Sequence, residues 1–136
     1  MVKEWNVVVV GVGALGNAVV QNLGLIGVRR VVVVDPDVVE ERNLERSVLL
    51  RGEGSIGRNK ALAVAEAAGR VFPETEWVAM DREIADVGFR VVAPADVVFG
   101  CVDSELARLE LAYIGTKLDT PVCDGGLGAP DYWHGG

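Results

Sequence analysis

The chain has 136 residues, of which 50% are hydrophobic and 24% are charged, so it is long enough for one domain with a buried core. Its 13 Lys and Arg against 20 Asp and Glu give a net charge of -7, which argues against a broad nucleic-acid surface. No apolar run approaches the ~20 residues of a membrane span, and the first residues do not resemble a signal peptide. Because its two cysteines are too few for a disulfide framework, the composition predicts a globular cytoplasmic domain.

Strand and helix patterns alternate in the first half of the chain. Residues 6–10 and 30–34 are valine-rich and predict strands, and residues 15–25 between them predict a helix that ends at Gly27. Residues 36–57 show little periodicity and are predicted to form a loop.

The second half continues this alternation. The predicted elements are a helix over 58–71, strands over 76–80 and 96–101, a helix over 104–117 with Ser104 as its N-cap, and a short strand over 121–123. Apolar strands separated by helices imply a parallel sheet that is covered on both faces. The predicted fold class is therefore α/β, with a doubly wound, mainly parallel, Rossmann-like sheet.

The last stretch, GGLGAPDYWHGG, has no periodicity, and the sequence stops within it. Because a sheet normally needs its edge covered or paired, we expect a truncated or excised nucleotide-binding domain. The alternative is a small complete protein with an irregular tail. The single histidine, His134, lies in this tail without a second ligand that would make a metal site.

A glycine-rich turn lies between the first predicted strand and helix. Gly11, Gly13 and Gly16 form a GxGxxG pattern, in which the first glycine permits a tight turn and the second lets a phosphate approach the backbone. The third glycine lets the helix pack closely on the strand, and the helix N-terminus offers free N–H groups to an anion. The pattern predicts a nucleotide-binding turn.

An acidic residue, Asp35, closes the second predicted strand. A carboxylate at this position can accept hydrogen bonds from ribose hydroxyls. This geometry suits NAD, FAD and ATP equally, so the turn and the carboxylate together leave the nucleotide open.

Polar and basic residues in the following stretch distinguish between these nucleotides. Asn43, Arg46 and Lys60 follow Asp35 in a loop and at the start of a helix, from which they can point back to the sheet edge where ligands of such folds bind. Arginine presents a bidentate fork to phosphate oxygens and lysine a compact charge. Two cations beside a glycine turn suit a triphosphate better than a pyrophosphate diester.

A further carboxylate, Asp103, comes just after the fourth predicted strand, at the same edge of the sheet. Mg²⁺ binds through few protein oxygens together with phosphate oxygens. Asp103 is therefore a candidate magnesium ligand.

The motifs GVGALG, DPDVVEERNLERS, GSIGRNKA and CVDS resemble those of the ThiF/MoeB family, relatives of the ubiquitin-activating enzymes. The resemblance runs from about Val7 to Gly126 and implies that residues 1–136 form an ATP-binding adenylation domain without the downstream half of the family fold. In that family the fold binds Mg-ATP and adenylates a carboxylate, often the C-terminal glycine of a ubiquitin-like modifier or sulfur-carrier protein. Family members are usually homodimers.

The resemblance also implies a role for each candidate residue. Asp35 would hold the ribose hydroxyls, and Asp103 would coordinate Mg²⁺. The phosphates would meet Asn43, Arg46 and Lys60, and the phosphate-facing turn would consist of Gly11, Gly13 and Gly16. Arg46, Lys60 and Asp103 would form the catalytic set. Asp37, in the same loop, is either structural or supporting.

The sequence departs from the family pattern at two points. Members commonly have Gln after the phosphate-binding Arg, whereas this chain has Ser47. Several members also use an Arg that a partner subunit contributes from a helix before the first strand, and no residue of this sequence matches it. Both departures bear on how the phosphates are held.

Two other functions remain open. An NAD-dependent oxidoreductase would have no use for Arg46, Lys60 and Asp103 together. A non-enzymatic module could keep nucleotide or protein binding without catalysis. Cys101 and Cys123 are both predicted to be buried packing residues rather than reactive thiols.

Overall fold

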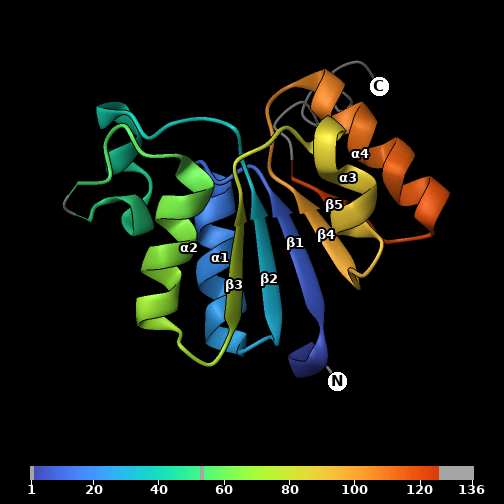
Figure 1. The fold of residues 1–136 in the computed structure, drawn as a ribbon, viewed down its shortest axis with the longest axis horizontal. Coiled ribbons are helices and arrows are strands. Elements are labelled where there is room, and N and C mark those ends of the chain that lie inside the picture. The colour runs from blue at the N-terminus through green and yellow to red at the C-terminus, as the bar shows by residue number, and fades with distance from the viewer. Residues whose placement is uncertain (1, 53, 126–136) are drawn as a thin grey trace, which may run out of the picture.

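A computed structural model describes residues 2–52 and 54–125, and a five-stranded parallel sheet forms its centre (Figure 1). The strands are β1 (Asn6–Val10), β2 (Arg30–Val34), β3 (Glu76–Met80), β4 (Val97–Gly100) and β5 (Val122–Asp124). They lie in the order β3-β2-β1-β4-β5, and every pairing is parallel. The predicted doubly wound α/β fold is confirmed.

The valine runs of β1 and β2 form the middle of the sheet. Val8 pairs in register with Val32, and all four valines of β1 are buried. Successive side chains of a strand point to opposite faces, so Val7 and Val9 join one apolar cluster whereas Val8 and Val10 join the other. Both faces are apolar because helices cover both of them.

Two pairs of helices form these outer layers (Figure 1). Helices α1 (Ala14–Ile26) and α2 (Lys60–Val71) pack on one face of the sheet. Helices α3 (Ile84–Val92) and α4 (Glu105–Leu118) pack on the other. This layering places the N-termini of the helices near the carboxyl ends of the strands, at the upper edge of the sheet in Figure 1.

The ends of the helices follow local sequence signals. Gly27 takes a left-handed conformation with φ of 79° and ends α1 as predicted. The Ser104 side chain accepts a hydrogen bond from the Ala107 N–H at 3.3 Å, which confirms the predicted N-cap of α4. Helix α2 begins later than predicted, because Asn59 caps it by accepting a hydrogen bond from the Leu62 N–H.

The sequence patterns missed several short elements. Helix α3 was not predicted, although Ile84, Val87 and Val91 lie on its buried face. Its glycine, Gly88, weakens the helical signal. A Cβ there would lie 2.3 Å from Ile114 Cδ1, so a larger residue would force the end of this α4 side chain to shift. The predicted loop over 36–57 contains two 3-10 helices, η2 (Glu41–Glu45) and η3 (Val48–Leu50), and η1 (Val2–Glu4) precedes β1.

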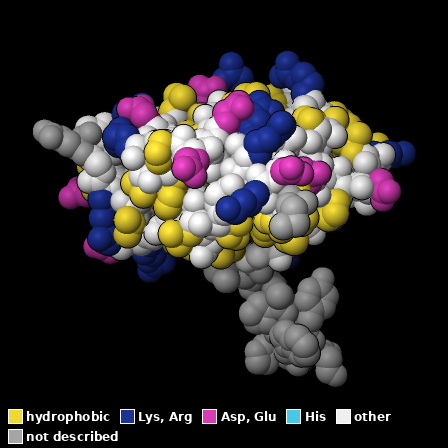
Figure 2. All heavy atoms as spheres, turned by 90° about the horizontal axis from the view of Figure 1, so that it is seen from below, with side chains coloured by type: hydrophobic (Ala, Val, Ile, Leu, Met, Phe, Trp, Pro, Cys, Tyr) yellow, Lys and Arg dark blue, Asp and Glu magenta, His cyan; other side chains and the backbone are white. Residues whose placement is uncertain are grey.

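The edge at the amino ends of the strands carries interspersed acidic and basic side chains (Figure 2). Arg30 Nε and Glu76 Oε2, for example, lie 3.2 Å apart at the starts of β2 and β3. None of the helices within the described ranges is both long and apolar enough to cross a membrane. The predicted irregular tail with His134 lies outside the described residues.

Candidate functional site

A cleft of about 690 Å³ opens at the carboxyl edge of the sheet, between the glycine turn and the first turns of α3 and α4. Five of the predicted site residues line it: Gly11, Gly13, Asp35, Lys60 and Asp103. They come from the ends of β1 and β2, the start of α2 and the segment after β4. The parallel sheet thus gathers residues that are far apart in the chain at a single edge.

The glycine turn depends on two close backbone approaches. Gly11 has a φ of +87°, and a Cβ on it would lie 2.5 Å from the carbonyl oxygen of Cys101. A Cβ on Gly16 would lie 2.0 Å from the carbonyl oxygen of Gly11. No side chain fits at either position, so these two glycines are required by packing within the turn itself.

The third glycine, Gly13, plays a different part. A Cβ on it would have no neighbour within 4 Å, so the space beside it is open. Gly13 is the N-cap of α1 and has no side chain to bond the first N–H groups of that helix. Those N–H groups and the positive end of the helix dipole are therefore available to an anion in the cleft.

Asp35 is held in a fixed orientation at the end of β2. Its side chain accepts hydrogen bonds from the Val12 N–H and the Asp37 N–H, both at 2.9 Å, and the residue is only 4% exposed. Each carboxylate oxygen keeps a lone pair for a further donor. Burial raises the pKa of the Asp35 carboxyl above its ordinary value, and the two N–H groups and the charge of Lys60 oppose this rise.

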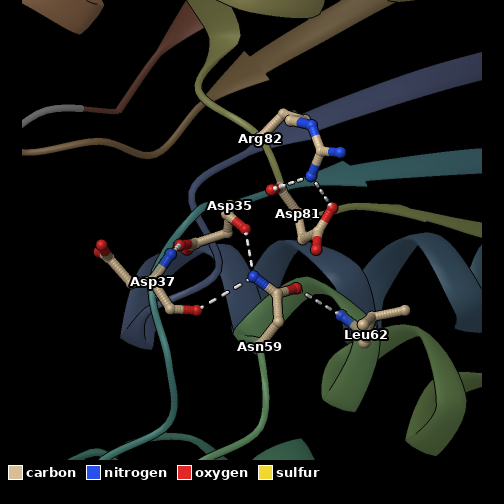
Figure 3. Close-up of polar contacts among 6 residues, drawn as sticks. All are labelled: Asp35, Asp37, Asn59, Leu62, Asp81 and Arg82. Carbon is tan, nitrogen blue, oxygen red and sulfur yellow. Dashed lines mark hydrogen bonds and ion pairs between the residues drawn. The ribbon is translucent and has the colours of Figure 1, made fainter.

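Asn59 connects the end of β2 to the start of α2 (Figure 3). Its Nδ2 donates to the carbonyl oxygens of Asp35 at 2.8 Å and Asp37 at 3.2 Å, while its Oδ1 caps α2. This link places Lys60, the next residue, beside the cleft. Sequence reasoning missed Asn59, although an Asn just before a helical pattern is an N-cap signal that could have identified it.

The structure places the other two predicted phosphate ligands outside the lining of the cleft. Asn43 Oδ1 accepts a hydrogen bond from the Glu40 N–H at 2.7 Å and so closes the first turn of η2. Arg46 follows η2 and is exposed, and within residues 2–52 and 54–125 no hydrogen bond or ion pair engages its side chain. The phosphate role of both residues stays a prediction.

A basic residue that the sequence analysis did not single out, Arg82, also lines the cleft. It follows β3, and its Nη1 donates to the backbone oxygen of Asp81 at 3.0 Å and to the Asp81 side chain (Figure 3). The carboxylic acids in the lining outnumber Lys60 and Arg82: they are Asp35, Asp37, Glu83, Asp86, Asp103 and Glu110. An anion entering this cleft therefore needs further positive charge.

The acidic side chains of the site determine how a metal ion could be bound. Within the described part of the chain, no group of three or more His, Cys, Asp or Glu side chains lies close enough to hold a metal by itself. Mg²⁺ needs only one or two carboxylates when substrate phosphates supply other ligands. Asp103 lines the cleft and is exposed, so its oxygens suit such a shared site.

The two cysteines differ in environment. Cys101 is half-buried, packs against the core and also lines the cleft, and burial raises the pKa of its thiol to about 11. The prediction that Cys123 is buried is wrong, because β5 is an edge strand and its second residue is exposed.

Comparisons with known proteins agree with the fold. Residues 1–130 match the model of the ThiF family. The chain is 43% identical over 103 residues to the adenylyltransferase and sulfurtransferase MOCS3 of Mus musculus. This match covers 75% of this chain and 22% of MOCS3. It is 30% identical over 117 residues to the sulfur carrier protein ThiS adenylyltransferase of Escherichia coli (strain K12), covering 85% and 46% respectively. The chain thus spans less than half the length of these relatives.

A solved structure has the same fold. E. coli tRNA N6-threonylcarbamoyladenosine dehydratase, TcdA, in complex with ATP, superposes with a TM-score of 0.80 at 21% identity. The match covers 90% of this chain and 51% of that chain.

Proposed function

The chain belongs to the ThiF family, and from this premise we propose that it binds Mg-ATP and transfers the adenylyl group to a carboxylate. The proposed acceptor is the C-terminal glycine of a ubiquitin-like or sulfur-carrier protein. Two relatives support this class, since one is the sulfur carrier protein ThiS adenylyltransferase of Escherichia coli and another is a SAMP-activating enzyme E1 of Haloferax volcanii.

One observation carries the proposal: a glycine turn, a ribose-type carboxylate, a lysine and a second carboxylate share one cleft. The turn ends β1, Asp35 ends β2 and Asp103 follows β4, so they lie in a row across neighbouring strands. A nucleotide lying along this row has its ribose at Asp35 and its phosphates between the turn and Asp103. Lys60 stands beside Asp35 and can bond a phosphate oxygen.

The proposed reaction needs positioning more than proton transfer. An oxygen of the acceptor carboxylate attacks the α-phosphorus of ATP, a new bond forms between them, and the bond to the bridging oxygen of the leaving pyrophosphate breaks. The acceptor is already ionised, so no general base is required. The chain contributes the N–H groups of α1, which the helix holds in place before the substrate arrives, and the Lys60 ammonium to the charged oxygens.

The acidic lining of the cleft explains why a metal is part of the proposal. Lys60 and Arg82 are the basic side chains among the lining residues, and they face a larger number of carboxylic acids. Mg²⁺ held by Asp103 would neutralise charge on the phosphates. Arg46, which follows η2, would supply a further cation.

The proposal is tested by pyrophosphate exchange. The protein is mixed with ATP, Mg²⁺ and labelled pyrophosphate, with and without candidate carrier proteins that end in glycine. Label that enters ATP only when a carrier is present supports adenylation, and a carrier with its terminal glycine deleted is the matched control. Omission of Mg²⁺ is expected to abolish exchange.

Other results would favour the alternatives. ATP binding without exchange, for any carrier tested, would favour a binding module without catalysis. Tight NADH binding without ATP binding would favour an oxidoreductase, which family membership disfavours. A homodimer remains a prediction from the resemblance, and light scattering of the purified chain would test it.

A further inference from the structure

Asn17 is a buried polar residue in the first turns of α1, one helical turn after Gly13. It is 1% exposed, and its carboxamide makes two hydrogen bonds to backbone groups. Its Nδ2 donates to the carbonyl oxygen of Val12 at 3.0 Å, and its Oδ1 accepts from the N–H of Leu49 at 3.1 Å. Both ends of this side chain are therefore satisfied by the backbone of other segments.

These two partners belong to segments that are far apart in the chain and meet at the same apolar cluster. Val12 lies inside the glycine turn, whereas Leu49 lies in η3, three residues after Arg46. We refer to residues 41–51, which contain η2, η3 and Arg46, as the η2–η3 segment. The Asn17 side chain joins this segment to the glycine turn across an interval of 32 residues.

Few other polar contacts fix the η2–η3 segment. Among the described residues, its remaining hydrogen bonds stay local, such as Leu50 N–H to Ser47 and the Arg51 side chain to Leu44 and Glu45. Leu49 and Leu50 are buried in the apolar cluster beside α2, but apolar packing is not directional. The bond from Asn17 is the polar contact that sets the segment relative to the turn.

We propose that Asn17 is a positioning residue that fixes the Arg46-bearing segment against the glycine turn, so that both address the same phosphates. This inference rests on the proposed function for its ligand, but its geometry is independent of it. An asparagine suits the role because one carboxamide supplies the donor for Val12 and the acceptor for Leu49. An aspartate would place a carboxylate oxygen against the Val12 carbonyl, and an alanine would leave both backbone groups unpaired.

The first test is hydrogen exchange of the whole chain. In Asn17→Ala, the Leu49 amide and its neighbours in residues 43–51 are expected to exchange at least about tenfold faster, while amides of β1 keep their rates. Asn22→Ala is the matched control, because Asn22 lies on the same helix and, among the residues that the structure describes, its side chain bonds only the Ala18 carbonyl oxygen. An unchanged Leu49 amide would overturn the proposal.

The second test is a double-mutant cycle on ATP binding, with adenosine as a ligand that lacks phosphates. Arg46→Ala is expected to weaken ATP binding by about tenfold or more in the wild-type background, but by less than about twofold when Asn17→Ala is present. Adenosine binding is expected to stay within about twofold in Asn17→Ala. The positioning role would be overturned if Asn17→Ala lowered the affinities for ATP and adenosine equally, or if the effects of the two substitutions on ATP affinity were additive.

The two tests separate this inference from the proposed function. If the wild-type chain binds no ATP, the proposed function fails while hydrogen exchange still decides whether Asn17 positions the segment. Asn17→Asp provides a second variant if Asn17→Ala does not fold, because it keeps the acceptor for Leu49 and loses the donor for Val12. In that variant the exchange of Leu49 is expected to stay slow, and a fast Leu49 amide would contradict the assignment of the two bonds.

Discussion

On one side of the cleft, the glycine turn and the end of β2 hold Gly11, Gly16 and Asp35 by close backbone contacts and buried hydrogen bonds. The second flank of the proposed phosphate site, the η2–η3 segment, contributes no residue to the lining of the cleft. It carries the exposed Arg46 between two 3-10 helices, with no partner for the Arg46 side chain among the described residues. The difference teaches that the first flank is already arranged for a ligand. The second flank depends on the packing of η3 and on the single bond from Asn17.

The largest expected effect is on the stability of the first flank. Gly16→Ala is expected to lower the free energy of unfolding by about 3 kcal/mol, because its Cβ would lie 2.0 Å from a backbone oxygen that cannot move freely. Gly13→Ala is the matched control and should cost no more than about 1 kcal/mol, since its Cβ would meet open space. Urea denaturation of both variants measures the difference, and equal losses would show that the turn is not close-packed.

Asp35→Ala tests whether the first flank binds ribose. Two hydroxyls donating to the carboxylate are worth about 1.5 kcal/mol each, so ATP affinity is expected to fall by about 3 kcal/mol in calorimetry. The wild-type chain should disfavour 2′,3′-dideoxy-ATP by a similar amount, and the variant should not distinguish the two nucleotides. A variant that still prefers ATP would contradict the ribose assignment. Thermal unfolding must accompany the measurement, because Asp35 also binds the Val12 N–H.

Arg46→Ala tests the second flank. Loss of a charged hydrogen bond to phosphate is expected to weaken ATP binding by about 2 kcal/mol, with little change for adenosine. Arg42→Ala is the matched control, because Arg42 lies in the same segment but pairs with Glu40 at 2.6 Å. If both substitutions weaken ATP equally, the effect is one of general charge and the assignment to Arg46 is wrong.

The smallest expected effect is a pH dependence of the free energy of unfolding, which arises from Asp35 on the first flank. Burial raises the pKa of Asp35 in the folded chain, so the folded state binds this proton more tightly than the unfolded state does. Relative to Asp35→Asn, the wild-type chain should therefore lose stability as pH rises from the ordinary carboxyl pKa through the raised one. Urea titrations at successive pH values measure this difference. Asp37→Asn removes an exposed carboxylate whose charge also raises the pKa of Asp35, so this variant should show a smaller pH dependence than the wild-type chain.

The fold could be predicted largely from local patterns. Valine runs and the glycine turn identify β1 and β2, and Gly27 and Ser104 mark helix ends through conformations and caps that act within a few residues. Helix α3 was not predicted because it is short and contains Gly88. The small size of Gly88 matters only for its close approach to Ile114, which lies on another helix. Signals of that kind depend on residues distant in the sequence.

The site was predictable to a similar extent. Gly11, Asp35, Lys60 and Asp103 were found because strand ends in a parallel sheet meet at one edge, and the structure brings them to one cleft. Asn17 was missed because its partner Leu49 is 32 residues away and nothing in the local sequence of α1 indicates it. The exposure of Cys123 could not be foreseen because it depends on β5 being the last strand of the sheet.

The central position of β1 has a consequence for how the chain acquires its structure during synthesis. β1 pairs on one side with β2, but its partner on the other side is β4, with Val7 beside Val97. At ribosomal rates of about 5–20 residues per second, that partner emerges roughly 5 to 20 seconds after the first strand. The β1 edge of this valine-rich ribbon thus stays open in the nascent chain, as a surface that a chaperone which shields aggregation-prone segments could cover.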